Sequence, residues 1–194
     1  MSNITLQIID LNTQMTDLYL QSRYEEALRV AICSCDLSRQ HFGEDNEIYS
    51  ISLCDLATIR SKLGQYAKAE SLFRQCLRIQ YRSLGESHPD VITTLKGLAD
   101  LYRRSGNYAE AEPLFGHVLD FYRRTVGENH LLFANSLNDL AMLFCLRKNH
   151  KAAKPLLQQA LEVYRTIFSD SHRLYIITLD KLNQLSEPEN PDKP

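Results

Sequence analysis

Apolar residues recur along the chain at spacings of three and four, the period of a helix that buries one face. The same positions return after 42 residues, as Leu53, Leu95, Leu137 and Leu179 illustrate. Short turns such as Gly64-Gln65-Tyr66 separate the apolar stretches. The pattern predicts pairs of helices at about 3–20 with 23–41, 47–62 with 65–83, 89–104 with 107–125, and 131–147 with 149–167, followed by a ninth helix at about 173–186.

A second repeated feature is the loop that precedes each new pair of helices. Leu84-Gly85-Glu86-Ser87-His88 returns as Val126-Gly127-Glu128-Asn129-His130, 42 residues later. Histidine also stands at position 172 in the next copy. We expect these histidines to pack against and cap the helix that follows them, not to share a metal ion.

A single helix pair with this pattern cannot bury its own apolar stripe, so the pairs must stack. A small residue recurs near the start of each second helix, and it would let neighbouring helices approach closely. These residues are Ala27, Ala69, Ala111 and Ala153. The ninth helix has no partner and carries Asn183 where the second, third and fourth units have alanine, which suits a C-terminal cap. The proline-rich tail 187–194 is predicted to be disordered.

The order Leu…Leu-Ala followed by Gly-x-Tyr-x-x-Ala-Glu-x-Leu-Phe resembles the tetratricopeptide repeat. The 42-residue spacing and the loop from Leu84 to Asp90 resemble the longer form found in kinesin light chains and many bacterial repeat proteins. The resemblance covers about residues 5–186. It implies an all-α, right-handed α-solenoid of four helix-turn-helix units at about 5–43, 47–85, 89–127 and 131–169, with a capping helix at 173–186. The region 1–186 would then be one repeat array.

The resemblance also implies a binding site, because the first helix of each repeat lines a concave groove that receives a peptide. The expected groove residues are Asp55, Thr58, Lys62, Lys96, Asp100, Arg103, Arg104, Asn135, Asn138, Asp139 and Met142. Asn138 stands where kinesin-light-chain-like repeats often carry an asparagine that holds a peptide backbone. The same place holds Cys54, Lys96 and Asp180 in other units, so most of that asparagine ladder is missing. A clamp of the kind that binds chaperone tails is not expected. It would need a lysine and an asparagine one helical turn apart on the same helix, whereas Asp100 follows Lys96 one turn later.

Charge and cysteine usage narrow the classes of partner and compartment. The 22 Lys and Arg against 24 Asp and Glu give a formal net charge of −2, without a general attraction to nucleic acid or anionic lipid. No apolar run is long enough to span a membrane, and the N-terminus lacks the features of a secretory signal. Five cysteines are an odd number without a disulfide framework, so we expect reduced thiols and a cytoplasmic location.

No catalytic or phosphate-binding motif occurs in the sequence, so we expect neither an enzyme nor a cofactor or metal site. The leading interpretation is a non-catalytic protein-protein interaction module that binds a peptide or protein in its groove as an adaptor or scaffold. One alternative is a regulatory or sensory subunit that controls an effector enzyme, such as an ATPase or a caspase-like protease. RNA binding through the row Arg74, Arg78 and Arg82 is a third reading, against which a solvated outer face is favoured. Homodimer formation is a further alternative.

Overall fold

The computed structural model describes residues 3–168 and 170–185, and within these ranges the chain forms nine α-helices and no strand. The helices are α1 (Asn3–Leu20), α2 (Tyr24–Phe42), α3 (Glu47–Lys62), α4 (Tyr66–Ser83), α5 (Pro89–Ser105), α6 (Tyr108–Thr125), α7 (Leu131–Leu146), α8 (His150–Ile167) and α9 (Arg173–Gln184). The predicted helices are therefore confirmed, with ends that shift by no more than two residues. The predicted tail at 187–194 lies outside the described residues.

Histidine or asparagine side chains cap the N-termini of five helices, α3, α5, α7, α8 and α9. The backbone N–H of Asp90 donates to Nδ1 of His88 at 3.2 Å, and His130 and His172 accept the equivalent bonds from Leu132 and Leu174, also at 3.2 Å. At the start of α3, Asn46 Oδ1 accepts from the N–H of Ile48 at 2.8 Å. Each bond satisfies an amide that the first helical turn leaves without a partner. The predicted capping role of these histidines is confirmed.

The turn inside each hairpin contains one residue whose backbone lies in the left-handed region, with positive φ. This residue is glycine in two hairpins and a residue with a side chain in the other two. Gly64 and Gly106 adopt φ of 74° and 83° at the repeat position where glycine carries no steric penalty. The first and fourth hairpins have Ser22 and Lys148 there, with φ of 59° and 55°. A side chain in this region costs about 1–2 kcal/mol, so these two hairpins retain the turn at a cost in stability.

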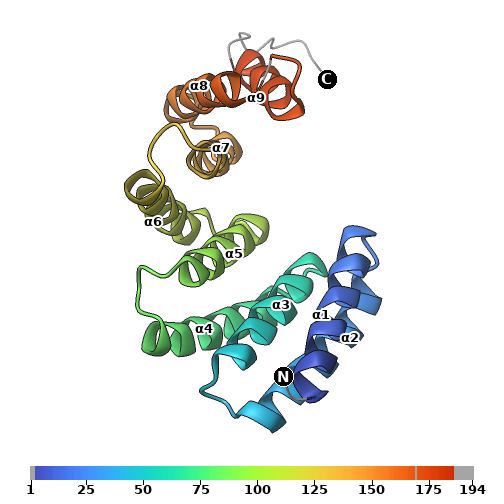
Figure 1. The fold of residues 1–194 in the computed structure, drawn as a ribbon. Coiled ribbons are helices and arrows are strands. Elements are labelled where there is room, and N and C mark those ends of the chain that lie inside the picture. The colour runs from blue at the N-terminus through green and yellow to red at the C-terminus, as the bar shows by residue number, and fades with distance from the viewer. Residues whose placement is uncertain (1–2, 169, 186–194) are drawn as a thin grey trace. The chain divides into compact units, whose positions relative to one another are not determined.

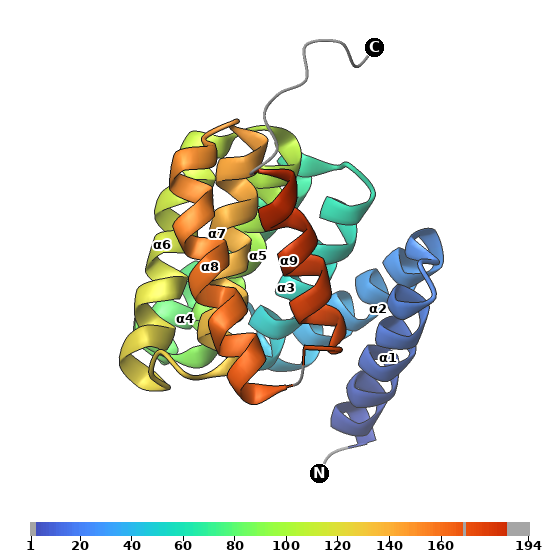
Figure 2. The ribbon, with the colours of Figure 1, turned by 90° about the horizontal axis from the view of Figure 1, so that it is seen from above.

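The chain divides into an N-terminal unit, Met1–Gly106, and a C-terminal unit, Asn107–Pro194. In the N-terminal unit, α1 pairs with α2 and α3 with α4, while α2 packs on α3 and α4 on α5 (Figures 1 and 2). In the C-terminal unit, α7 pairs with α8, and α6 and α9 pack on α7 and α8 respectively. Among the described residues, no helix combines the length and the apolarity that crossing a bilayer requires.

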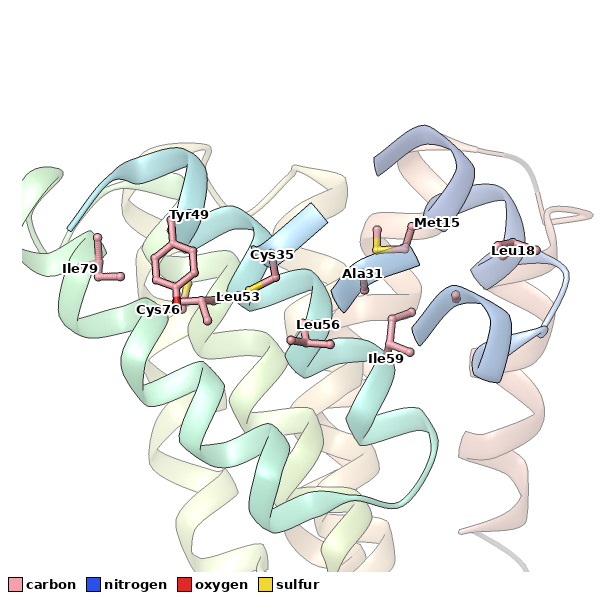
Figure 3. Close-up of a cluster of buried hydrophobic side chains, with 11 residues drawn as sticks. Met15, Leu18, Ala31, Cys35, Tyr49, Leu53, Leu56, Ile59, Cys76 and Ile79 are labelled. Carbon is pink, nitrogen blue, oxygen red and sulfur yellow. The ribbon is translucent and has the colours of Figure 1, made fainter. Parts of the chain in front are cut away.

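The core of the N-terminal unit is a continuous cluster of side chains from α1 to α4 (Figure 3). Leu53 and Ile79 are each 1% exposed within it. The small residues predicted to allow close approach are fully buried, with no exposed surface on Ala27, Ala69, Ala111 or Ala153. The members of the cluster are Met15, Leu18, Ala27, Ala31, Cys35, Tyr49, Leu53, Leu56, Ile59, Cys76 and Ile79.

Gly97 lets α5 lie close to α4. A Cβ built at this position would stand 2.9 Å from Cε1 and 3.0 Å from Cζ of Phe73, whose side chain is 1% exposed. The buried ring would have to move to admit even one methyl group, because protein interiors are close-packed. Gly97 is therefore required for the packing of these two helices.

We expect Gly97→Ala to lower the free energy of unfolding by about 1–2 kcal/mol, because the overpacking cost exceeds the gain in helix propensity. Gly116→Ala is the matched control, since a Cβ there meets no atom within 4 Å. It should raise stability by about 0.5–1 kcal/mol. Urea unfolding followed by circular dichroism measures both. Equal effects from the two variants would show that the Phe73 contact does not limit this packing.

Candidate functional site

One face of α3 carries three of the predicted groove residues. Asp55, Thr58 and Lys62 are spaced by three and four residues, so they form a single stripe on the helix. The stripe borders α1, which forms its hairpin with α2 and not with α3. Two adjoining hollows lie along this face, and Tyr19 and Thr58 line both of them.

The first, the acidic hollow, lies between α1 and α3 and has a volume of about 230 Å³. This volume is below the roughly 300–1,000 Å³ of typical small-molecule sites. The hollow therefore suits a side chain of a partner better than a drug-sized ligand or a cofactor. Its lining residues are Met15, Thr16, Tyr19, Asp55, Thr58 and Ile59.

Asp55 is the charged residue of the acidic hollow. It is half-buried, and it makes no hydrogen bond or ion pair with another residue in the described parts of the chain. Burial raises the pKa of its carboxyl to about 6, because the surrounding side chains remove water that would solvate the anion. The hollow thus holds a carboxylate that lacks an internal cation.

The second, the basic hollow, continues along α3 toward α5 and has a volume of about 90 Å³. Its floor includes Phe73 and Gly97, so the close approach of α4 and α5 also shapes this site. Three cations and one carboxylate surround it. The lining residues are Tyr19, Thr58, Ser61, Lys62, Phe73, Gly97, Asp100, Arg103 and Arg104.

The charges of the basic hollow are only partly compensated from within. Arg103 donates two hydrogen bonds to Oδ1 of Asp100, at 2.7 and 3.0 Å. Lys62 places its Nζ 5.5 Å from the centre of the Tyr19 ring, a cation–π arrangement. Arg104 is exposed and forms no ion pair with the residues that the structure describes. The hollow therefore keeps an excess of positive charge.

Of the predicted groove residues, the structure brings six together around the two hollows. These are Asp55, Thr58, Lys62, Asp100, Arg103 and Arg104. Lys96 lies on α5, one turn before Asp100, and lines neither hollow. The remaining four lie on α7 in the C-terminal unit; they are Asn135, Asn138, Asp139 and Met142.

The asparagines of α7 differ in their surroundings. Asn135 Oδ1 accepts a hydrogen bond at 2.8 Å from the hydroxyl of Tyr164, a residue that is 1% exposed. This bond gives Asn135 a structural role. Asn138 has a buried Oδ1 with no hydrogen-bond partner within the described ranges, so this oxygen does not face the surface in the unbound chain. A role of Asn138 in holding a partner stays a prediction.

The sequence interpretation missed Tyr19, Ser61, Phe73 and Gly97, which all line the basic hollow. The repeat register contains a signal for three of them. Tyr19 and Ser61 stand 84 and 42 residues before Arg103, and Gly97 stands 42 residues after Asp55; Arg103 and Asp55 are both predicted groove residues. Nothing in the register points to Phe73. Its ring reaches the hollow only because Gly97 leaves room for it.

The other candidate features stand apart from these hollows. In the row proposed as an RNA-binding face, Arg74 donates to Glu70 and to the hydroxyl of Tyr102, and Arg82 lies 3.7 Å from Asp45. Cys33 is exposed whereas Cys35 is buried, and both are free thiols. Within the described residues, no three histidine, cysteine or acidic side chains are placed to share a metal ion.

Comparison with known proteins identifies the repeat. A family model described as tetratricopeptide repeat matches residues 16–82, 80–124 and 90–166, well over half of the chain. The chain belongs to the tetratricopeptide repeat (TPR) family. The predicted family and the all-α solenoid class are thereby confirmed. No curated protein matches this TPR chain in sequence.

Solved structures support the same fold. The crystal structure of BtubC (BKLC) from P. vanneervenii has a TM-score of 0.80 at 16% identity, and the match covers 94% of this chain and 72% of that one. A Podosopora anserina protein described as a kinesin light chain with nearly identical TPR-like repeats also has a TM-score of 0.80, at 19% identity, covering 95% of this chain and 87% of that one. The fold is thus that of kinesin-light-chain-like TPR proteins.

The raised pKa of Asp55 predicts a pH-dependent stability of this TPR chain. In the unfolded chain the carboxyl ionises at about pH 4, whereas in the fold it keeps its proton up to about pH 6. The folded state binds more protons over this interval, so stability falls as the pH rises from about 4 to about 6. Asp55→Asn should therefore stabilise the chain by about 1–3 kcal/mol at pH 7 and by almost nothing at pH 4.

Urea unfolding of the wild type and Asp55→Asn at both pH values measures this difference. Asp36→Asn, an exposed change on α2, is the matched control and should shift stability by less than about 0.5 kcal/mol at either pH. A destabilised Asp55→Asn at pH 7 would mean that the carboxylate has a favourable partner in the folded chain.

Proposed function

We propose that this TPR chain is a non-catalytic adaptor or scaffold that binds a peptide segment of a protein partner. The observation that carries the proposal is the pair of adjoining hollows along α1, α3 and α5. Each is sized for individual side chains, and together they present carboxylate, hydroxyl, aromatic and guanidinium groups along one line. A peptide can bind along these hollows by inserting one side chain into each, while its backbone stays at the surface.

The C-terminal unit offers its own proposed contacts on α7. Asn138 supplies a carboxamide, a group that can both donate to and accept from a peptide backbone, although its oxygen is buried in the unbound chain. Asp139 and Met142 are on the same helix and remain proposed partner-binding residues. Asn135 also remains one, although its Oδ1 already accepts the hydrogen bond from Tyr164. The five cysteines are free, and reduced thiols are typical of the cytoplasm, where we place the function.

A blocked-groove variant tests the proposal. Thr58 lines both hollows, so Thr58→Arg should fill them with a long charged side chain. A library of random peptides is selected on the purified wild-type chain, and the peptides recovered are measured against the variant by fluorescence anisotropy. We expect Thr58→Arg to weaken binding at least about tenfold, the loss of roughly 1.4 kcal/mol of binding free energy.

Arg78→Glu is the matched control, because Arg78 is exposed on α4 and lines neither hollow. Both variants must keep the helical circular dichroism and unfolding midpoint of the wild type. Recovered peptides that bind Thr58→Arg as tightly as the wild type would overturn the groove assignment. A library that yields no ligand at all would overturn the peptide-binding function.

A further inference from the structure

The two hollows carry charges of opposite sign at a defined spacing. Asp55 and Lys62 are seven residues apart on α3, which corresponds to about 10 Å along the helix axis. An extended peptide advances about 3.3 Å per residue, so about three residues cover this distance. A ligand that follows α3 would therefore meet both charges within one short segment.

The described residues place no cation beside the carboxylate of Asp55 in the acidic hollow. Asp55 has no ion-pair partner in the described parts of the chain, and its neighbours in the hollow are Met15, Thr16, Tyr19, Thr58 and Ile59, none of which is cationic. A half-buried carboxylate without a counter-ion is costly. An incoming ammonium or guanidinium group would remove that cost and gain a charge-assisted hydrogen bond.

The basic hollow has the opposite property, an excess of positive charge that an anionic group of a ligand would balance. The carboxylate of Asp100 is already paired with Arg103. The positive charges of Lys62 and Arg104 therefore have no carboxylate partner among the described residues. The guanidinium of Arg104 is exposed and can offer two parallel N–H donors to one carboxylate. A carboxylate of the ligand in the basic hollow would complement this excess positive charge.

We propose that this face of the N-terminal unit recognises a mixed-charge peptide, which places a lysine or arginine in the acidic hollow and an aspartate or glutamate in the basic hollow about three residues away. This inference rests on the proposed function and names the ligand class for it. The arrangement also excludes the two simpler alternatives. A polyanionic peptide would leave Asp55 facing a like charge, and a polycationic peptide would meet the excess positive charge beside Arg104.

The test starts from a library peptide whose binding is lost in Thr58→Arg. Its charged residues are replaced singly by alanine, and charge-pair variants are made with the basic and acidic residues three apart, in either order, or directly adjacent. Removal of either charge should weaken binding about 5- to 30-fold. The adjacent arrangement should bind about as weakly as the single replacements.

Charge reversal on the chain identifies which hollow holds which residue. Asp55→Lys should weaken binding of the parent peptide, and binding should recover when the peptide's basic residue becomes glutamate. Asp36→Lys makes the same charge change at an exposed position of α2 and should leave binding of both peptides unchanged. Circular dichroism confirms that both variants remain folded.

The outcomes separate this inference from the proposed function. In one contrary result, the peptides that do not bind Thr58→Arg lack the charge pair; in another, they keep their affinity for the wild type when the pair is removed. Either result would overturn the mixed-charge ligand and leave the proposed peptide binding in place. Failure of the glutamate peptide to recover binding to Asp55→Lys would also overturn the assignment of the cation to the acidic hollow. Absence of any groove-dependent peptide would overturn both.

Discussion

Close approach between helices is the constraint on which the structure of each unit depends. The alanine near the start of each second helix has no exposed surface, and Gly97 brings α5 against the ring of Phe73. A helix hairpin of this kind cannot bury its own leucine stripe, so it must pack against a neighbour at short range. The loops serve the same arrangement, because His88, His130 and His172 each satisfy an amide at the start of a packed helix.

The candidate site follows from places where this packing is incomplete. Helix α1 pairs with α2, and the space between α1 and α3 is left as the acidic hollow. The same glycine that closes α4 against α5 shapes the floor of the basic hollow. The candidate site and the core packing are thus determined by the same helices, and the hollows are lined by residues of helices and not of loops.

Asp55 shows how the proposed ligand-binding role and the stability of the fold oppose each other at the candidate site. Its repeat position holds glycine in the third unit, where the residue serves helix packing. In the second unit the position carries a carboxylate that burial makes harder to ionise. A group that destabilises the folded chain and has no internal partner is a candidate for interaction with a ligand. The tolerance of the fold for either residue leaves this position free to determine ligand chemistry.

The sequence by itself determined the repeat, the positions of the helices and the family, because the buried leucines and alanines recur every 42 residues and tolerate little variation in size. It also pointed to Asp55, Thr58 and Arg104, since surface positions of a helix follow from its period. Only the tertiary structure decided that Asp55 lacks a cation and that Phe73 reaches the site. These features depend on distances between side chains of different helices, and such distances are not encoded in the period of any one helix.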